Sequence, residues 1–230
     1  MARHNLLRQF KGNLTPAQAA EGIRVAVHNA RGLLKDAELL LENERWSRAC
    51  ALAILAIEEA GKPEIIRGLL LARDGKELKR AWQSYRSHAK KNVSWILPQL
   101  VIEGSRNLED FASIFDETRD HAQLLDSVKQ IALYSDSCGN CHWSLPSHVI
   151  DANLARTIVS IAKVLIPEGE AAMSSEAELE LWIKHMQPIW KQDMKLMKLA
   201  LVACYEEAKE KGVLSGSHTP EDMAEFVRLE

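Results

Sequence analysis

The sequence is poor in glycine and proline, with 11 and 7 among 230 residues, and it has few aromatic residues apart from six tryptophans. Because glycine and proline interrupt helices, their scarcity permits long helical segments. No apolar run approaches the roughly 20 residues that a membrane span requires. The first residues, MARHNLLRQFKGN, lack the apolar stretch and cleavage site of a signal peptide. We therefore expect a cytoplasmic protein that makes no membrane contact.

An excess of positive charge is also missing. The formal net charge is −3 and the sequence pI is about 6.3. These values argue against a protein that coats nucleic acid through an overall positive field, although a local basic site stays open. With 47% hydrophobic and 27% charged residues, the composition is that of a globular protein with a substantial core.

Cysteine is scarce as well, with residues only at Cys50, Cys138, Cys141 and Cys204. In a reducing compartment these four do not predict a disulfide framework. Cys50 and Cys204 stand in apolar helical contexts, so we expect both in the core.

Helical periodicity dominates what is present, and no convincing alternation of period two occurs. Thr15-Pro16-Ala17-Gln18 has the form of a capping box that opens a helix running to about Glu42. The next helix, Arg45 to Gly61, has no polar face in its middle and is predicted to be central and fully surrounded. Further helices are predicted over 64–72, 76–91, 108–134, 148–165, 175–186 and 189–211, with a short one opening at Thr219. The fold class is therefore all-α.

The stretch ILAIEEAGK, from Ile54 to Lys62, ends an apolar helix in two acids and a base. Glu58 and Lys62 are four residues apart with the acid first, which is the favourable order for an ion pair on a helix. An unpaired buried carboxylate is costly, so Glu58 and Glu59 must reach water or meet cations. One interpretation is an ion-pair network without chemistry, and the other is a functional polar site.

The segment from Lys76 to Lys91, KELKRAWQSYRSHAKK, has a strong local excess of cations. On one helix, Arg80, Ser84, His88 and Lys91 would share a face. A histidine beside fixed cations suits phosphate chemistry, because imidazole exchanges protons near neutral pH and cations stabilise charge on phosphoryl oxygens. The alternative is a solvated basic face.

The loop CGNCH, from Cys138 to His142, matches the pattern of haem attachment, which would require export. A zinc site formed by Cys138, Cys141 and His142 would need a fourth ligand. A redox pair normally follows a strand, and none is predicted here. Coincidence, metal binding and redox chemistry all stay open for this loop, and we expect no other metal and no cofactor.

Several separated segments resemble one known family, the AbiV abortive-infection proteins of the HEPN helical superfamily. These segments are LLKDAELLLENERWSRACALAILAIEEAGK (Leu33–Lys62), WQSYRSHAKK (Trp82–Lys91), ALYSD (Ala132–Asp136) and WSLP (Trp143–Pro146). The resemblance implies a HEPN-like helical bundle, which we place at residues 1–169. It does not reach residues 170–230, whose predicted helices we expect to form a C-terminal extension packed on the same domain. It also implies a homodimer.

The resemblance further implies an activity, since many relatives are metal-independent endoribonucleases that act as toxins. In such enzymes His and Arg assist the attack of a ribose 2′-hydroxyl on the adjacent phosphate. The usual signature on a late helix is Arg, a polar residue, a few more positions and then His. This chain has Lys129, Gln130 and Tyr134 in the corresponding helix.

Carried over to this sequence, the resemblance assigns proton transfer to His88. Arg86 or Lys91 would hold the phosphate, and carboxylates including Glu59 would orient these groups. The supporting polar cluster would consist of Glu58, Lys62, Arg80, Tyr134 and Asp136.

The leading hypothesis is thus an anti-phage abortive-infection protein that cleaves RNA and blocks translation. The rival hypothesis is a non-catalytic helical module that binds a phage or host protein, an antitoxin, RNA or a nucleotide. The altered signature favours the module, and the basic histidine segment favours the enzyme.

Overall fold

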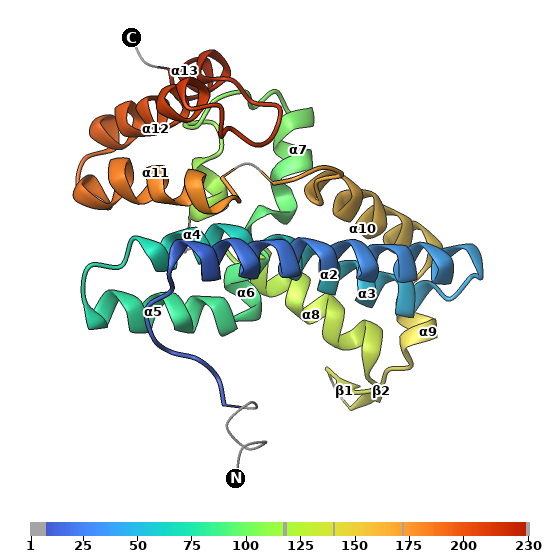
Figure 1. Ribbon diagram of the computed structural model, residues 1–230. Coiled ribbons are helices and arrows are strands. Elements are labelled where there is room, and N and C mark those ends of the chain that lie inside the picture. The colour runs from blue at the N-terminus through green and yellow to red at the C-terminus, as the bar shows by residue number, and fades with distance from the viewer. Residues whose placement is uncertain (1–7, 117–118, 140, 172, 229–230) are drawn as a thin grey trace.

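The computed structural model describes residues 8–116, 119–139, 141–171 and 173–228, without the side chains of Phe115 and Cys138. Within these ranges the fold is all-α, as predicted, apart from one small hairpin (Figure 1). The α-helices are α2 (Pro16–Glu42), α3 (Trp46–Ala60), α4 (Lys62–Leu70), α5 (Gly75–Arg86), α6 (His88–Lys91), α7 (Leu97–Ile102), α8 (His121–Leu133), α9 (Pro146–Val149), α10 (Ala152–Leu165), α11 (Glu176–Met186), α12 (Met194–Glu210) and α13 (Pro220–Val227). Short 3-10 turns are η1 (Val93–Ile96), η2 (Ala112–Phe115) and η3 (Gln187–Ile189).

The first long helix begins where its capping box predicts. The Thr15 side chain accepts a hydrogen bond from the Gln18 backbone, and the Gln18 side chain accepts one from the Thr15 backbone. These bonds satisfy two amide groups that the first turn of a helix leaves without partners. From Pro16 the helix continues to Glu42 and packs along α3.

Helix α3 is the centre of the bundle, as its uninterrupted apolar sequence predicts. It packs against α2, α8 and α10, and it lies behind α2 in Figure 1. Cys50 and Ile54 on α3 are fully buried in a cluster that also holds Leu125 of α8 and Ile158 of α10. Full burial of a large aliphatic side chain such as Ile54 stabilises the fold by about 1.5–3 kcal/mol.

The predicted helix over 76–91 is in fact two helices, because the chain is extended at Ser87 (ψ 128°). The Ser87 hydroxyl accepts a hydrogen bond from the Lys90 amide and so serves as the N-cap of α6. Serine competes well for this role because its short side chain can replace a backbone acceptor. The prediction that Arg80, Ser84, His88 and Lys91 continue one helical face was therefore wrong.

The predicted helix over 108–134 is also shorter, and α8 begins only at His121. The Asp110 carboxylate accepts hydrogen bonds from the backbone amides of Arg106 and Asn107 and from the Asn107 side chain. These local bonds hold a turn in place of a first helical turn. The single 3-10 turn η2 follows before α8.

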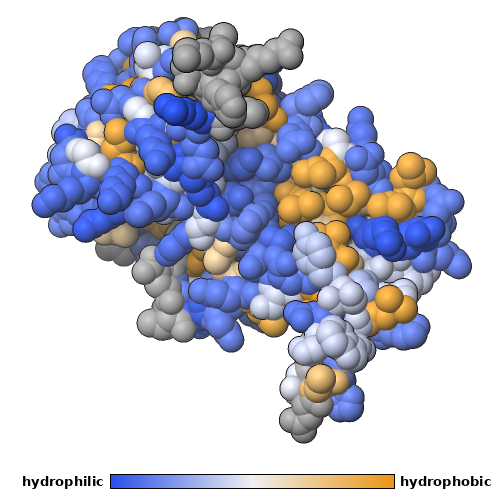
Figure 2. Space-filling model, turned by 90° about the horizontal axis from the view of Figure 1, so that it is seen from below, coloured by the Kyte–Doolittle hydropathy of each residue, from blue (hydrophilic) through white to orange (hydrophobic). Residues whose placement is uncertain are grey.

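After α8 the chain forms a two-stranded antiparallel ribbon, β1 (Ser137–Cys138) with β2 (His142–Trp143). The sequence pattern did not predict these two-residue strands, which are too short to show alternation. The ribbon projects from the bundle in both Figure 1 and Figure 2. The predicted helix over 148–165 is split as well, because Asp151 is extended and caps α10 through the Leu154 amide.

Helices α11 to α13 pack together beyond residue 169. Cys204, Tyr205 and Leu181 form a small core there. Leu179 on α11 joins Ile23 and Val27 of α2 in a second cluster, which attaches these helices to the bundle. The domain boundary at residue 169 stays a proposal.

Two further expectations can be compared with the structure. Cys50 and Cys204 are buried as predicted, and burial raises the pKa of each thiol to about 12. In the ranges that the structure describes, no helix combines the length and the apolar character needed to cross a membrane.

Gly61, at the junction of α3 and α4, permits a close approach of α6. A Cβ atom added at Gly61 would lie 2.2 Å from the Lys91 carbonyl oxygen, although the backbone (φ −79°) suits any residue. The contact is with backbone, so it cannot be relieved by a side-chain rotation. Gly61 therefore sets the distance between α3 and α6.

We predict that Gly61→Ala destabilises the protein by about 1–3 kcal/mol, because α6 must move away from α3. Urea unfolding followed by circular dichroism would measure this loss. The control is Gly32→Ala, inside α2 with nothing within 4 Å of the added methyl group. That change should stabilise the helix by about 0.5–1 kcal/mol. Equal effects of the two substitutions would contradict the steric account.

Candidate functional site

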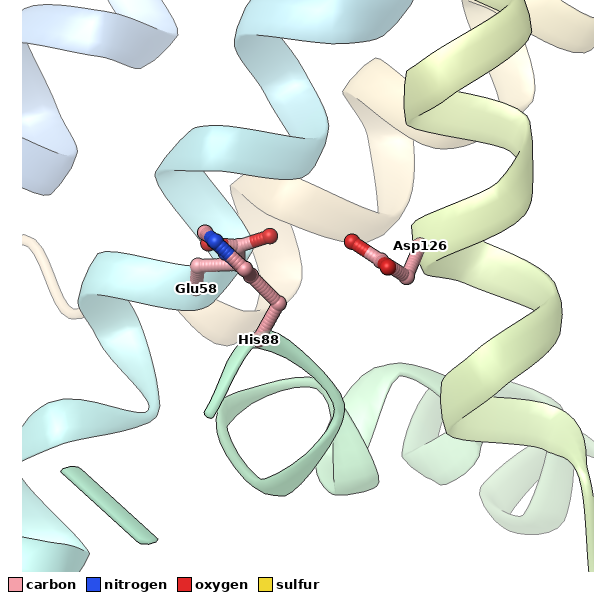
Figure 3. A group of neighbouring side chains, drawn as sticks. All are labelled: Glu58, His88 and Asp126. Atoms are coloured by element: carbon pink, nitrogen blue, oxygen red, sulfur yellow. The ribbon is translucent and has the colours of Figure 1, made fainter. Parts of the chain in front are cut away.

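A charged cluster lies where α3, α6 and α8 meet. Its centre is Glu58, in the last turn of α3, whose side chain is only 3% exposed. Figure 3 shows His88 of α6 directly beside Glu58, with Asp126 of α8 pointing toward them. Lys91 and Lys129 complete the cluster.

Lys129 connects the two carboxylates of the cluster. Its Nζ atom lies 2.5 Å from Glu58 Oε1 and 2.6 Å from Asp126 Oδ1. The Lys129 side chain is 4% exposed, so it is almost as deeply buried as that of Glu58. A buried ion pair of this kind is tolerated when each charge has a close partner.

The short helix α6 supplies the other two members. His88 Nδ1 lies 2.6 Å from Glu58 Oε2, and Lys91 Nζ lies 3.5 Å from the same oxygen. Lys91 is buried, whereas the His88 side chain is 53% exposed. His88 is therefore the member of the cluster that faces solvent most openly.

The pKa values of the cluster follow from these contacts. Burial by itself would raise the pKa of Glu58, but hydrogen bonds from Lys129 and His88 and the charges of Lys129 and Lys91 lower it below its ordinary value. Burial would likewise lower the pKa of Lys129, but its bonds to Asp126 and Glu58 raise it. Both groups are thus charged at neutral pH.

The ionised Glu58 fixes the proton of His88 when the imidazole is neutral. A carboxylate only accepts hydrogen bonds, so the 2.6 Å contact requires a proton on His88 Nδ1. The lone pair is then on Nε2, and no hydrogen bond joins Nε2 to any described part of the chain. This arrangement provides an oriented base on a solvent-facing ring.

Glu58, His88 and Asp126 also have the spacing of metal ligands, with one candidate atom of each within 4.8 Å of the others. The position between the two carboxylates is taken by the Lys129 ammonium, however. With Lys91 nearby, two positive charges balance two negative ones. A divalent cation would have to displace Lys129, so the donor set fits proton transfer better than metal binding.

The second acid of the EEAGK stretch does not join the cluster. Glu59 Oε1 lies 2.5 Å from Lys62 Nζ, and Lys62 also lies over the ring of Tyr85. The spacing along the helix had predicted an ion pair between Glu58 and Lys62, but Lys62 pairs with Glu59. Glu58 instead points inward, because α6 and α8 supply its cations.

Arg86 and Arg80 lie away from the cluster. The Arg86 guanidinium donates to the carbonyl oxygens of Trp82 and Phe10 and covers the Trp82 ring. It thereby holds the segment before α2 against α5. Arg80 is exposed on α5 and lines a separate small cleft.

Tyr134 and Asp136 are not in the cluster either. Tyr134 is 60% exposed at the end of α8. The Asp136 backbone bonds to Ser144 and its carboxylate accepts from the Ser137 amide, so Asp136 closes the hairpin.

The CGNCH loop forms the tip of this hairpin. Cys141 and His142 are exposed, and Cys141 has a left-handed backbone (φ 67°). The side chain of Cys138 and all of Asn140 lie outside the described part of the chain. The metal and redox hypotheses for this loop therefore stay untested.

Asp126 and Lys129 were not among the predicted site residues. The signal for Lys129 was nevertheless in the sequence, because Ala122, Leu125, Lys129 and Ala132 repeat at helical spacing and are all buried. A lysine inside an apolar stripe requires a buried acid as partner. The resemblance had marked Lys129 only as standing where an arginine is usual.

We predict that Glu58→Gln lowers the free energy of unfolding by about 3 kcal/mol at neutral pH, because Lys91 and Lys129 lose a buried counter-charge. Urea denaturation would measure this loss. The control is Glu64→Gln, which removes an acid whose side chain is 71% exposed. It should cost less than about 0.5 kcal/mol.

The stabilisation by Glu58 should also depend on pH. The pKa of Glu58 is lower in the folded chain than the ordinary 4.5, so the unfolded chain binds more protons. The stabilisation is complete above pH 4.5 and is lost as pH falls through the folded pKa. The difference in stability between wild type and Glu58→Gln should therefore shrink in this acid window. A difference that stays constant into acid would contradict the assignment.

Comparison with known proteins agrees with this architecture. The sequence model of the family described as AbiV, within the HEPN group, matches residues 18–167. This range contains α3, α6 and α8, and thus the whole charged cluster. No curated protein matches the chain, and no solved structure does either. The match covers well over half of the sequence, and the chain therefore belongs to the AbiV family of HEPN proteins.

Proposed function

We propose that this chain is a cytoplasmic abortive-infection protein that cleaves RNA without a metal ion. The observation that carries the proposal is the short contact between His88 Nδ1 and the buried Glu58 carboxylate. It orients the imidazole of a side chain that is 53% exposed and leaves Nε2 without a hydrogen bond to any described residue. An oriented histidine whose lone pair faces solvent can act as a general base.

In the proposed reaction, His88 Nε2 takes the proton from a ribose 2′-hydroxyl. The 2′ oxygen forms a bond to the adjacent phosphorus, and the bond from phosphorus to the 5′ oxygen breaks. The departing oxygen takes a proton from water, so the products are a 2′,3′-cyclic phosphate and a 5′-hydroxyl. Two cations, Arg86 and Lys91, were predicted to bind the phosphate. Of these, Lys91 belongs to the cluster, since its Nζ atom lies 3.5 Å from the Glu58 oxygen that contacts His88. Its charge would favour the negative phosphoryl group.

A second function has support from the same cluster. Lys91 and Lys129 are both buried and paired with carboxylates, which suits a structural ion network. Under this alternative the chain is a non-catalytic module that binds a phage protein, an antitoxin or RNA. The RNA experiment below separates the two functions, because the module binds without cleaving.

We predict that the purified full chain cleaves single-stranded RNA in the presence of a chelator and leaves cyclic phosphate ends. His88→Ala should lower the rate at least about a hundredfold, because it removes the general base. Gel analysis of end-labelled RNA would measure the rate. The control is His28→Ala, which removes an exposed histidine from α2.

Two results would count against the nuclease. One is wild-type protein that binds RNA but leaves it intact, which favours the binding module. The other is equal cleavage by wild type and His88→Ala, which would show that His88 is not the base.

We also propose that the chain forms a homodimer through the face around the hairpin. Exposed apolar side chains gather there on consecutive elements, at Leu133, Tyr134, Trp143, Leu145 and Val149. Figure 2 shows apolar side chains grouped on the surface beside the projecting ribbon. An exposed apolar surface of this kind often marks an interface.

For the dimer, light scattering coupled to size exclusion should give twice the chain mass of 25.8 kDa. Trp143→Asp should produce monomers, because it places a charge in the interface. Leu39→Asp, at a residue 59% exposed on α2, is the matched control and should leave the dimer intact. A wild-type mass equal to one chain would rule the dimer out.

A further inference from the structure

A small cleft lies beside α5, and none of its lining residues belongs to the charged cluster. It has a volume of about 190 Å³ and is bounded by the end of α4, by α5 and by the segment after η3. Arg80 and Ser84 line one side, and Trp190 and Lys191 line another. Figure 1 shows the end of α11 next to the turn between α4 and α5, and the Gln187 side chain bonds to the Leu70 carbonyl oxygen there.

The cations around this cleft outnumber its one lining acid. Glu77, the carboxylate in the lining, is paired with Arg73 at 2.8 Å, and the bonds from Arg73, with a smaller effect of the Lys191 charge, lower the pKa of Glu77 to about 2. Within the described residues Arg80 makes no ion pair, and it is exposed. Lys191 is exposed as well. The cleft therefore carries a net positive charge that suits a phosphate group.

The cleft also offers an aromatic surface. Trp190 is partly exposed, and the Lys191 ammonium lies 5.9 Å from the centre of its ring. Ile65 and Ala72 provide apolar contact on the α4 side. An aromatic ring next to cations is the arrangement with which proteins bind single-stranded nucleic acid, since the base stacks and the phosphate is neutralised.

Helix α5 connects this cleft to His88. Arg80 and Ser84 are one turn apart on the helix, and α6 with His88 begins just after its end. At a rise of 1.5 Å per residue, α5 continues for roughly 9 Å from Arg80 to its last residue, Arg86, and α6 begins two residues later with His88. An extended strand can cover this distance with a short run of nucleotides.

We propose that this cleft, formed by Arg80, Ser84, Trp190 and Lys191, binds a nucleotide of single-stranded RNA that flanks the bond at His88. The proposal rests on the nuclease function in naming the bond, whereas binding in the cleft can be measured without cleavage. Arg80 and Lys191 contact phosphate, and Trp190 stacks on a base.

The test uses the full chain carrying His88→Ala, so that the RNA stays intact, and a short fluorescein-labelled single-stranded RNA. Adding Arg80→Glu and Lys191→Glu should weaken binding at least about tenfold and lower the slope of log affinity against log salt by about 2. Adding Trp190→Ala should weaken binding about fivefold or more. The matched control reverses Arg45 and Arg48, which are exposed at the other end of the bundle, and should change affinity less than about twofold.

Fluorescence anisotropy distinguishes the outcomes. Equal affinity of the Arg80/Lys191 and Arg45/Arg48 variants would overturn the proposal, and so would absence of RNA binding by the parent His88→Ala protein. If wild type cleaves RNA and the Arg80/Lys191 reversal leaves KM unchanged, the cleft assignment fails while the nuclease stands. If wild type does not cleave but the reversal abolishes binding, the cleft assignment stands and the nuclease fails.

Discussion

The structure depends on one buried carboxylate. Glu58 closes an apolar helix in the middle of the bundle, where an unpaired charge would be costly. Three groups from two other helices contact it, and these contacts specify how α6 and α8 approach α3. Gly61, one turn further, allows the Lys91 backbone to come close enough for the contact. Packing and charge thus place α6 at the same position.

The same interaction determines what the site can do chemically. Because the Lys129 and Lys91 charges keep Glu58 ionised, the carboxylate acts as an acceptor and orients His88. Because Lys129 occupies the space between Glu58 and Asp126, the cluster is electrically balanced without a metal ion. His88 is left as the most exposed member of a cluster whose Glu58, Lys91 and Lys129 side chains are buried. This combination favours proton transfer at the surface of the bundle.

Much of the fold could be predicted from the sequence, because its signals are local. The capping box at Thr15 and the apolar run of α3 depend on residues within a few positions, and both were confirmed. The breaks at Ser87 and around Asp110 were missed, because short polar side chains there compete with a helical pattern that otherwise continues. The two-residue strands of the hairpin have no period that a sequence can show.

The site could be predicted only in part. Glu58, His88 and Lys91 converge as expected, because an acid that ends a buried helix must find cations. Arg86 and Asp136 were expected in the same cluster, but each is bound to nearby backbone. Spacing along a chain does not show which of several cations reaches a buried acid, since that depends on how separate helices pack. Lys129 was not among the predicted site residues, but its place could have been inferred, because a lysine within an apolar helical stripe requires a buried acid as partner.

The most direct test of the account is the proton position on His88, measured by nitrogen NMR of the imidazole rings with His88→Ala used for assignment. In neutral His88 the account predicts a proton on Nδ1 and a lone pair on Nε2, and loss of this preference when Glu58 is replaced by leucine in a chain that also carries Lys129→Met. A neutral ring protonated on Nε2, or a spectrum that does not respond to the change at Glu58, would contradict it.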